Sequence, residues 1–202
     1  MDPAEDRSSR ADARRRQVLD AAIRCFRRHG FHATSVAEIA AEAAMSVGHI
    51  YRYFAGKDDI IQAIVREDVE ESLAGMAQLE TAGGDLYRTL IDGADEAADR
   101  GFDPDRAALM LEVRAEAARN PRVAAVVQAA DRELRANFGR ILAQAKPDGW
   151  SAADIAARVE MMALIYEGVA LRAISHPDLD RAALGVMMRR VLAALLTPPS
   201  GD

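Results

Sequence analysis

The sequence has few of the features that mark a secreted or membrane protein. It holds one cysteine, Cys25, among 202 residues, so no disulfide can form within the chain, and a reducing compartment is indicated. No run approaches the roughly 18 uninterrupted apolar residues that a membrane-spanning helix needs. Residues 1–16 are mostly charged or polar, which does not fit a signal peptide. We therefore expect a cytoplasmic protein with no membrane partner.

Motifs of the common enzyme classes are also absent. The sequence contains no G-x-G-x-x-G, no P-loop and no His-Glu-x-x-His. The 4 histidines are scattered along the chain, without a Cys/His set at metal-ligand spacing. We expect no catalytic residues, no metal and no cofactor, and hence not an enzyme.

Long stretches of two-residue alternation are missing too, which excludes a large sheet. Apolar residues recur instead at three- and four-residue spacings, and proline and glycine separate the stretches. The sequence thus predicts an all-α fold of about nine helices, preceded by disorder over residues 1–9. The helices are expected at 10–29, 35–42, 46–54, 57–79, 85–100, 104–119, 122–146, 152–175 and 180–196, with clear breaks at 81–84 and 147–149.

The N-terminal segment carries the most specific local signals. Gly30 is a natural stop for the first helix, whose apolar stripe includes Leu19 and Phe26. Ser35 and Glu38 have the spacing of a capping box that opens a second short helix. A turn at 43–45 follows, and Ser46 is placed to cap a third helix. Two short helices joined by a tight turn favour DNA binding, because this layout lets the second helix enter the major groove.

Charge is distributed unevenly along the chain. Residues 1–57 carry 10 Lys/Arg and 7 Asp/Glu, whereas residues 58–202 carry 16 and 25, which accounts for the net charge of −6. A mildly basic N-terminal part and an acidic remainder favour an approach to DNA phosphates through the N-terminal part. The same asymmetry is also compatible with an ordinary scatter of charged residues over the surface.

A longer pattern runs through the same segment. It comprises Val18-Leu19, Ala21-Ala22, Phe26, Gly30, Thr34-Ser35-Val36, Ile39-Ala40, Ser46, Gly48, Ile50-Tyr51, Tyr53-Phe54 and Lys57. With this spacing, residues 18–61 resemble the N-terminal domain of TetR-family transcriptional regulators. Where the family usually has Gly and Val in the turn, this sequence has Ala44 and Met45, and Val47 and His49 replace the usual Lys and Thr. The operator sequence therefore does not carry over from the family.

The resemblance and the chemistry of the side chains nominate the DNA contacts. Gly48 lets the backbone approach the groove, Val47 suits a thymine methyl, and His49 can bond a base edge or a phosphate. The other candidate residues carry a hydroxyl or a cation that is placed to reach a phosphate, and Ser46 among them also caps the third helix. The full set is Thr34, Ser46, Val47, Gly48, His49, Tyr51, Arg52, Tyr53 and Lys57.

The resemblance further implies a C-terminal helical bundle that encloses a small-molecule effector. The candidate lining residues, which are equally compatible with a plain core, are Leu86, Leu90, Met110, Arg114, Phe138, Met162 and Tyr166. Arg114 lies in an apolar run and needs a partner, for which Glu112, Glu116, Glu167 or an acidic effector are candidates.

The last two expected helices are apolar on most sides, which favours either a homodimer through a four-helix interface or a central place within one subunit. The expected interface residues are Ile165, Val169, Leu184, Met188, Val191 and Leu195.

The sequence thus predicts a helix-turn-helix domain at 10–56 and an effector-binding and dimerisation domain at 57–196. The expected function is that of a transcriptional regulator, a repressor released from a palindromic double-stranded operator by a small molecule. The alternatives are a DNA-binding regulator without an effector, controlled by a protein partner or acting architecturally, and an all-α protein–protein adaptor.

Overall fold

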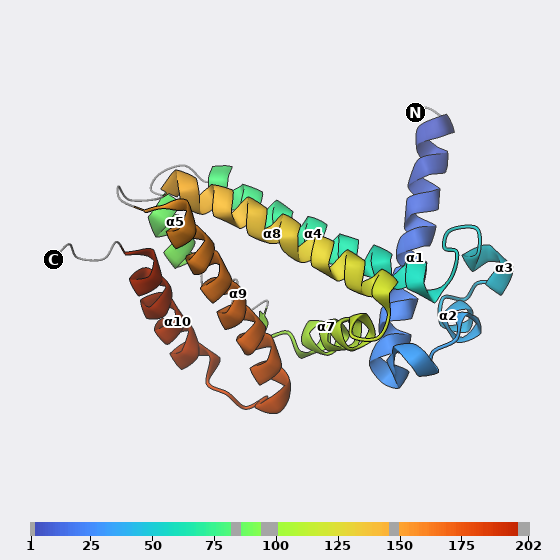
Figure 1. Cartoon of the computed structure of the whole chain (residues 1–202). Helices are drawn as coiled ribbons and strands as arrows, with labels where there is room; N and C mark the ends of the chain where they lie inside the picture. Colours follow the sequence, from blue (N-terminus) through green and yellow to red (C-terminus); the bar gives the residue numbers. More distant parts are fainter. Residues whose placement is uncertain (1–2, 82–85, 94–100, 146–149, 198–202) are drawn as a thin grey trace. The chain divides into compact units, whose positions relative to one another are not determined.

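The computed structural model describes residues 3–81, 86–93, 101–145 and 150–197, and within these ranges every regular element is a helix (Figure 1). The predicted all-α class is therefore confirmed. In chain order the helices are α1 (Pro3–Ala33), α2 (Val36–Glu42), α3 (Val47–Ile50), α4 (Lys57–Thr81), α5 (Leu86–Asp92), α7 (Pro104–Ala117), α8 (Pro121–Ala145), α9 (Ala152–Ser175) and α10 (Arg181–Leu196). Of the predicted breaks, 82–84 and 147–149 lie outside the described ranges.

Helix boundaries differ from the predictions at several places. The first helix was expected to stop at Gly30, but α1 has a kink there and continues to Ala33. The expected disorder of residues 1–9 is wrong from Pro3 onward, because α1 begins there and proline is well suited to the first turn of a helix. The third helix ends at Ile50 rather than at residue 54, for reasons given with the site below. Helix α5 ends at Asp92, and the rest of the helix predicted for 85–100 is outside the described residues.

Contacts divide the chain into two compact units. The first comprises Met1–Asp68 and Ala108–Ala130, and the second comprises Val69–Ala107 and Asp131–Asp202. Helices α4, α7 and α8 each contribute to both units. The division into units falls within these helices, and the domain boundary expected near residue 56 stays a prediction.

The core of the first unit is built as the apolar pattern predicts. Leu19 and Phe26 of α1 are 2% and 1% exposed, and Ile39 and Ile50 are fully buried beside them. Gly30 interrupts α1 with φ 76° and ψ 163°, a backbone conformation that glycine adopts at least cost. Figure 1 shows α2 next to the C-terminal half of α1, and α3 next to α2.

The second unit contains two apolar clusters. One gathers Ile141, Leu142, Met162, Leu192 and other residues from α5, α8, α9 and α10. The other joins Phe102 to α9 and α10. None of the helices in the described ranges is long and apolar enough to span a membrane.

The turn between α2 and α3 contains a strained alanine. Among the described residues, Ala44 is the only one other than glycine with a positive φ, 51°. The N–H of Met45 donates to Ala40 O (2.9 Å) and that of Ala44 to Ala41 O (3.1 Å), which is the bonding pattern of a helix end that favours glycine at the left-handed position. The departure from the family's glycine therefore leaves the backbone in the left-handed conformation.

The Ala44→Gly variant should raise the free energy of unfolding by about 1 kcal/mol, because glycine removes the steric penalty of the left-handed conformation. Urea denaturation monitored by circular dichroism measures the change. Gly30→Ala is the matched control of opposite sign, because its Cβ would lie 3.3 Å from Glu112 Oε2 at φ 76°. An unchanged or lower unfolding free energy for Ala44→Gly would contradict the assignment of strain.

Candidate DNA-binding site

The segment from Ser46 to Phe54 is a short helix followed by a tight turn. The Ser46 hydroxyl accepts the N–H of His49 at 3.2 Å and caps α3, as predicted. Beyond Ile50 the chain winds more tightly, and the N–H groups of Arg52 and Tyr53 donate to the carbonyls three residues before them, at 3.2 and 2.9 Å. This tightening satisfies carbonyls at the end of a short helix and accompanies the burial of Phe54, which is 1% exposed.

One side of this segment is displayed to solvent. Val47 is 38% exposed and Tyr51 is 54% exposed. No atom lies within 4 Å of the position that a Cβ on Gly48 would occupy, and Arg52 is exposed as well. These four residues define what we call the recognition surface. It combines an apolar methyl surface, accessible backbone, a hydroxyl and a cation, which are groups that contact base edges and phosphates.

His49 and Tyr53 lie side by side at the edge of the recognition surface. Their rings are stacked, with centroids 5.5 Å apart, and the Tyr53 hydroxyl lies 3.4 Å from His49 Nε2. Both side chains are partly buried. Tyr53 therefore restricts the orientation of the His49 ring.

The structure places two other candidate residues, Thr34 and Lys57, differently. Thr34 is 1% exposed, and its hydroxyl donates to Gly30 O at 2.8 Å. The ammonium of Lys57 donates to Phe31 O at 2.6 Å and His32 O at 3.3 Å. Both polar groups thus bond backbone carbonyls of residues 30–32, at the Gly30 kink and directly after it.

The start of α2 already carries a negative charge. Glu38 accepts the N–H of Ser35 at 2.6 Å, and its own N–H donates to the Ser35 hydroxyl at 3.1 Å, so the predicted capping box is confirmed. These bonds from Ser35 lower the pKa of Glu38. An ionised carboxylate at this helix end disfavours a phosphate close to Thr34, which was among the candidate DNA contacts.

Sequence reasoning did not assign the carboxylates that brace the segment after Gly30. Glu112 accepts the N–H of Phe31 at 3.2 Å. Glu116, which is 2% exposed, lies 3.1 Å from His32 Nε2 and 3.0 Å from Arg119 Nε. The spacing of Glu112 and Glu116, four residues apart in an apolar run, was the signal that could have revealed this role. The sequence, however, suggested only Arg114 as their partner.

A further carboxylate, Glu42, joins α2 to α1. It accepts hydrogen bonds from Arg24 Nε at 2.6 Å and Arg28 Nη2 at 2.9 Å. These two arginines, Arg24 foremost, lower the pKa of Glu42. The basic side of α1 thus includes cations that hold α2 in place.

Among the candidate effector residues, only part of the set is brought together. Leu90 and Met162 are buried in one cluster of the second unit, with Phe138 and Tyr166 packed against it. Met110 packs against the core of the first unit instead, and Arg114 is exposed on α7. Leu86 begins α5, but its side chain is not among those described.

The expected dimer residues are mostly used within the subunit. Val169 and Met188 are 6% and 4% exposed. Ile165, Leu184 and Leu195 are partly buried against the same two clusters. Of the six candidates only Val191, at 43%, is exposed.

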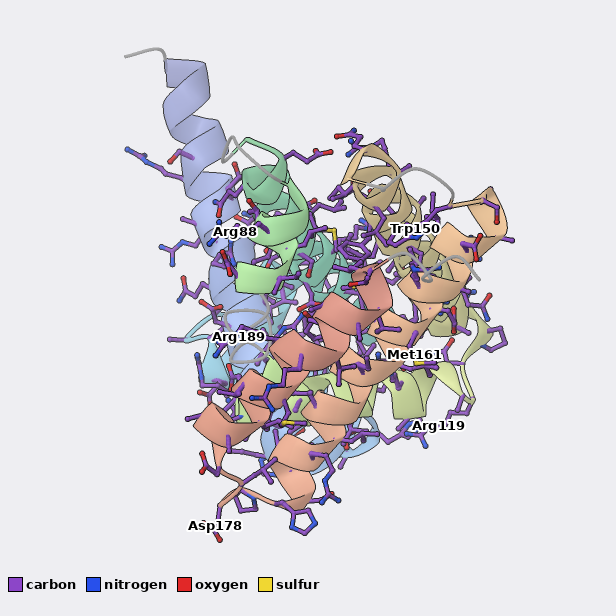
Figure 2. All side chains as sticks on the ribbon, turned by 90° about the vertical axis from the view of Figure 1, so that its left-hand side faces the viewer. Arg88, Arg119, Trp150, Met161, Asp178 and Arg189 are labelled. Atoms are coloured by element: carbon purple, nitrogen blue, oxygen red, sulfur yellow. The ribbon has the colours of Figure 1, made fainter. Side chains whose placement is uncertain are left out.

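The exposed apolar side of α9 and α10 is formed by Val191 together with residues outside the predicted set. These are Met161, Leu164, Leu171, Ile174, Val186 and Met187. Figure 2 looks towards α9 and α10 and labels Met161 on α9. The helical period alone could not distinguish this face from the buried one, because both are apolar.

A capped helix, a tight turn and a displayed short helix, packed on a third helix, define a helix-turn-helix DNA-binding protein. Two family models match this chain: residues 18–64 match "Bacterial regulatory proteins, tetR family", and residues 87–197 match "BetI-type transcriptional repressor, C-terminal". The chain belongs to the TetR family of transcriptional regulators, with a C-terminal domain of the BetI type.

Individual relatives agree with this assignment. The HTH-type transcriptional regulator UidR of Escherichia coli (strain K12) is 27% identical over 195 residues, which cover 96% of this chain and 98% of UidR. The solved structure of Salmonella enterica GusR matches with a TM-score of 0.75 at 28% identity, covering 91% of this chain and 95% of that chain. The structure of FadR from Bacillus subtilis in complex with stearoyl-CoA shares the fold, with a TM-score of 0.74 at 19% identity over 90% of this chain and 98% of that chain.

The Lys57→Met variant should lower the free energy of unfolding by about 1–2 kcal/mol, because two backbone carbonyls lose a charged donor. Lys57 also lies 4.6 Å from the centre of the Phe31 ring, and this contact is lost as well. Thermal and urea denaturation measure the effect, and Arg52→Met on the recognition surface is the control, expected to change little. Equal stability of wild type and Lys57→Met would show that the contacts are not stabilising.

Proposed function

We propose that the protein represses transcription as a homodimer, which places two recognition surfaces in successive major grooves of a palindromic operator and is released by a small-molecule effector. The observation that carries the proposal is the recognition surface itself. Val47, Gly48, Tyr51 and Arg52 are displayed together at a capped four-residue helix, while the opposite side of that segment is buried.

Within this proposal the candidate DNA residues have different roles. Val47, Gly48 and His49 face base edges, and Tyr51 and Arg52 reach phosphates. Ser46, Thr34 and Lys57 act through the fold, because their polar groups bond α3 or the segment after Gly30. Tyr53 orients His49.

The proposed dimer forms through the exposed apolar face of α9 and α10. Met161, Leu164 and Leu171 lie on one side of α9 with Gly168 between them, and no atom lies within 4 Å of a Cβ placed on Gly168. A small residue at this point lets a partner helix approach closely. Covering several large apolar side chains stabilises a dimer by roughly 25 cal/mol for each Å² of apolar surface removed from water.

The proposed effector site is the cluster that contains Leu90, Phe138, Met162 and Tyr166. Burial raises the pKa of Tyr166 to about 12, and its hydroxyl has no hydrogen-bond partner among the described residues. A desolvated phenol in an apolar cluster is suited to hold the polar group of an otherwise apolar ligand. Support from other proteins is at the level of the fold, through the FadR complex with stearoyl-CoA.

Effector binding lowers operator affinity only if the effector binds the DNA-free form more tightly, typically by 1–3 kcal/mol. Helices α4, α7 and α8 contribute to both compact units. An effector that changes the packing of these helices in the second unit therefore acts on helices that also form part of the first unit.

Operator binding is tested with a duplex selected from a randomised pool by the wild-type protein. We expect a palindromic duplex bound by a dimer, with affinity that falls steeply as salt rises, because phosphate contacts release counterions. The Leu164→Glu/Leu171→Glu variant should be monomeric in sedimentation and should bind this duplex at least ten-fold more weakly, because it loses the second half-site.

Leu111→Glu is the matched control for these substitutions, because Leu111 is an exposed leucine on α7 (38%) and its replacement should leave the dimer intact. Failure of the wild type to enrich any duplex would refute the repressor function. A double variant that remains dimeric would refute the proposed interface while leaving DNA binding unaffected.

The effector site is tested with Tyr166→Phe in a thermal-shift screen against lipophilic amines, acyl-CoA esters and phenolics. Without ligand, this variant should melt close to the wild-type temperature, because the Tyr166 hydroxyl that it removes makes no hydrogen bond within the described residues. A compound that stabilises the wild type should stabilise Tyr166→Phe less and should release the selected duplex. A compound that stabilises both proteins equally would place the site elsewhere, and no response to any compound would favour the regulator without an effector.

A further inference from the structure

We propose that Arg15 and Gln17 of α1 are positioning residues for operator recognition: they hold the two ends of the recognition segment without contacting DNA themselves. The inference rests on the proposed DNA-binding function. It concerns two polar side chains of α1 that each donate a hydrogen bond to a backbone carbonyl beside the recognition segment, inside the first unit.

Gln17 holds the turn that precedes α3. Its Nε2 donates to Ala43 O at 2.7 Å, and Ala43 is the C-cap of α2, directly before the strained Ala44. The other end of the Gln17 amide is also bonded, because Oε1 accepts from Arg14 Nη1 at 2.8 Å. Since both ends of the amide have partners, its orientation is set and its donor points at the turn.

Arg15 holds the opposite end of the segment. Its Nη1 donates to Tyr53 O at 3.0 Å, and its guanidinium carbon lies 4.5 Å from the centre of the Phe54 ring. The arginine thus bonds a carbonyl and covers an aromatic ring of the last residues of the segment. A planar guanidinium donates in its own plane, so it can bond the carbonyl while its face lies over the ring.

The recognition segment needs external support of this kind. Helix α3 has 4 residues, and a helix of one turn is not stable by itself. Its apolar anchors, Ile50 and Phe54, fix one side of the segment in the core. Gln17 and Arg15 add a directional bond before and after α3, and these bonds restrict rotation and sliding of the helix on that core.

An arginine near a recognition helix has a second possible role, a direct contact with a phosphate, and the two roles differ in measurable ways. Loss of a phosphate contact weakens binding to every sequence alike and reduces the salt slope by about 1. Loss of a positioning contact misaligns base readout. Affinity for the selected duplex then falls while non-specific affinity and the salt slope remain unchanged.

The experiment compares full-length Arg15→Met, Gln17→Met and Arg15→Lys with wild type on the selected duplex and on a scrambled duplex of the same composition. Each is measured over a series of salt concentrations. Arg15→Met and Gln17→Met should lose about ten-fold or more in affinity for the selected duplex and little for the scrambled one, with an unchanged salt slope. Arg15→Lys retains a donor for Tyr53 O and should recover part of the lost specificity.

Arg52→Met is the control for phosphate contact, because Arg52 is exposed on the recognition surface; it should weaken both duplexes and lower the slope. Circular dichroism confirms folding of each variant, and if Arg15→Met does not fold, Gln17→Met and Arg15→Lys decide the question. A reduced slope for Arg15→Met with equal loss on both duplexes would overturn the inference, as would unchanged specificity in Gln17→Met. Failure of the wild type to select any duplex would instead refute the proposed function.

Discussion

A recognition helix of 4 residues depends on its surroundings for its shape and position. Ser46 caps its first turn, Ile50 and Phe54 anchor it in the core, and the left-handed turn at Ala44 sets the angle at which it leaves α2. Each support is local in sequence or is provided by α1. The short helix therefore exposes one face to solvent because its other face is fixed in the core by these residues.

Polar side chains in the first unit divide into two groups according to their partners. Thr34, Lys57 and Glu112 bond the backbone of residues 30–32, at the kink where Gly30 has a positive φ that favours glycine. Tyr51 and Arg52 are displayed on the recognition surface. A charge near the DNA-binding segment is thus not sufficient evidence of a DNA contact, because the backbone after Gly30 requires several of these groups for itself.

The two compact units have helices in common, and this bears on regulation. The first turn of α7 belongs to the second unit, whereas its later turns carry Glu112 and Glu116 in the first. These carboxylates bond Phe31 and His32, directly after the kink of α1. Like α4 and α8, helix α7 is therefore a continuous element with residues in both units.

Local signals in the chain are enough to predict where most helices lie, the capping box at Ser35, the cap at Ser46 and an interruption of the first helix at Gly30. Each of these depends on residues within a few positions of one another. The contacts that individual side chains make cannot be predicted from such local signals. Whether Lys57 meets a phosphate or two carbonyls, and which apolar side of α9 faces outward, depends on segments far away in sequence. Helical periodicity names the apolar residues of a helix, but packing alone selects which of them are covered.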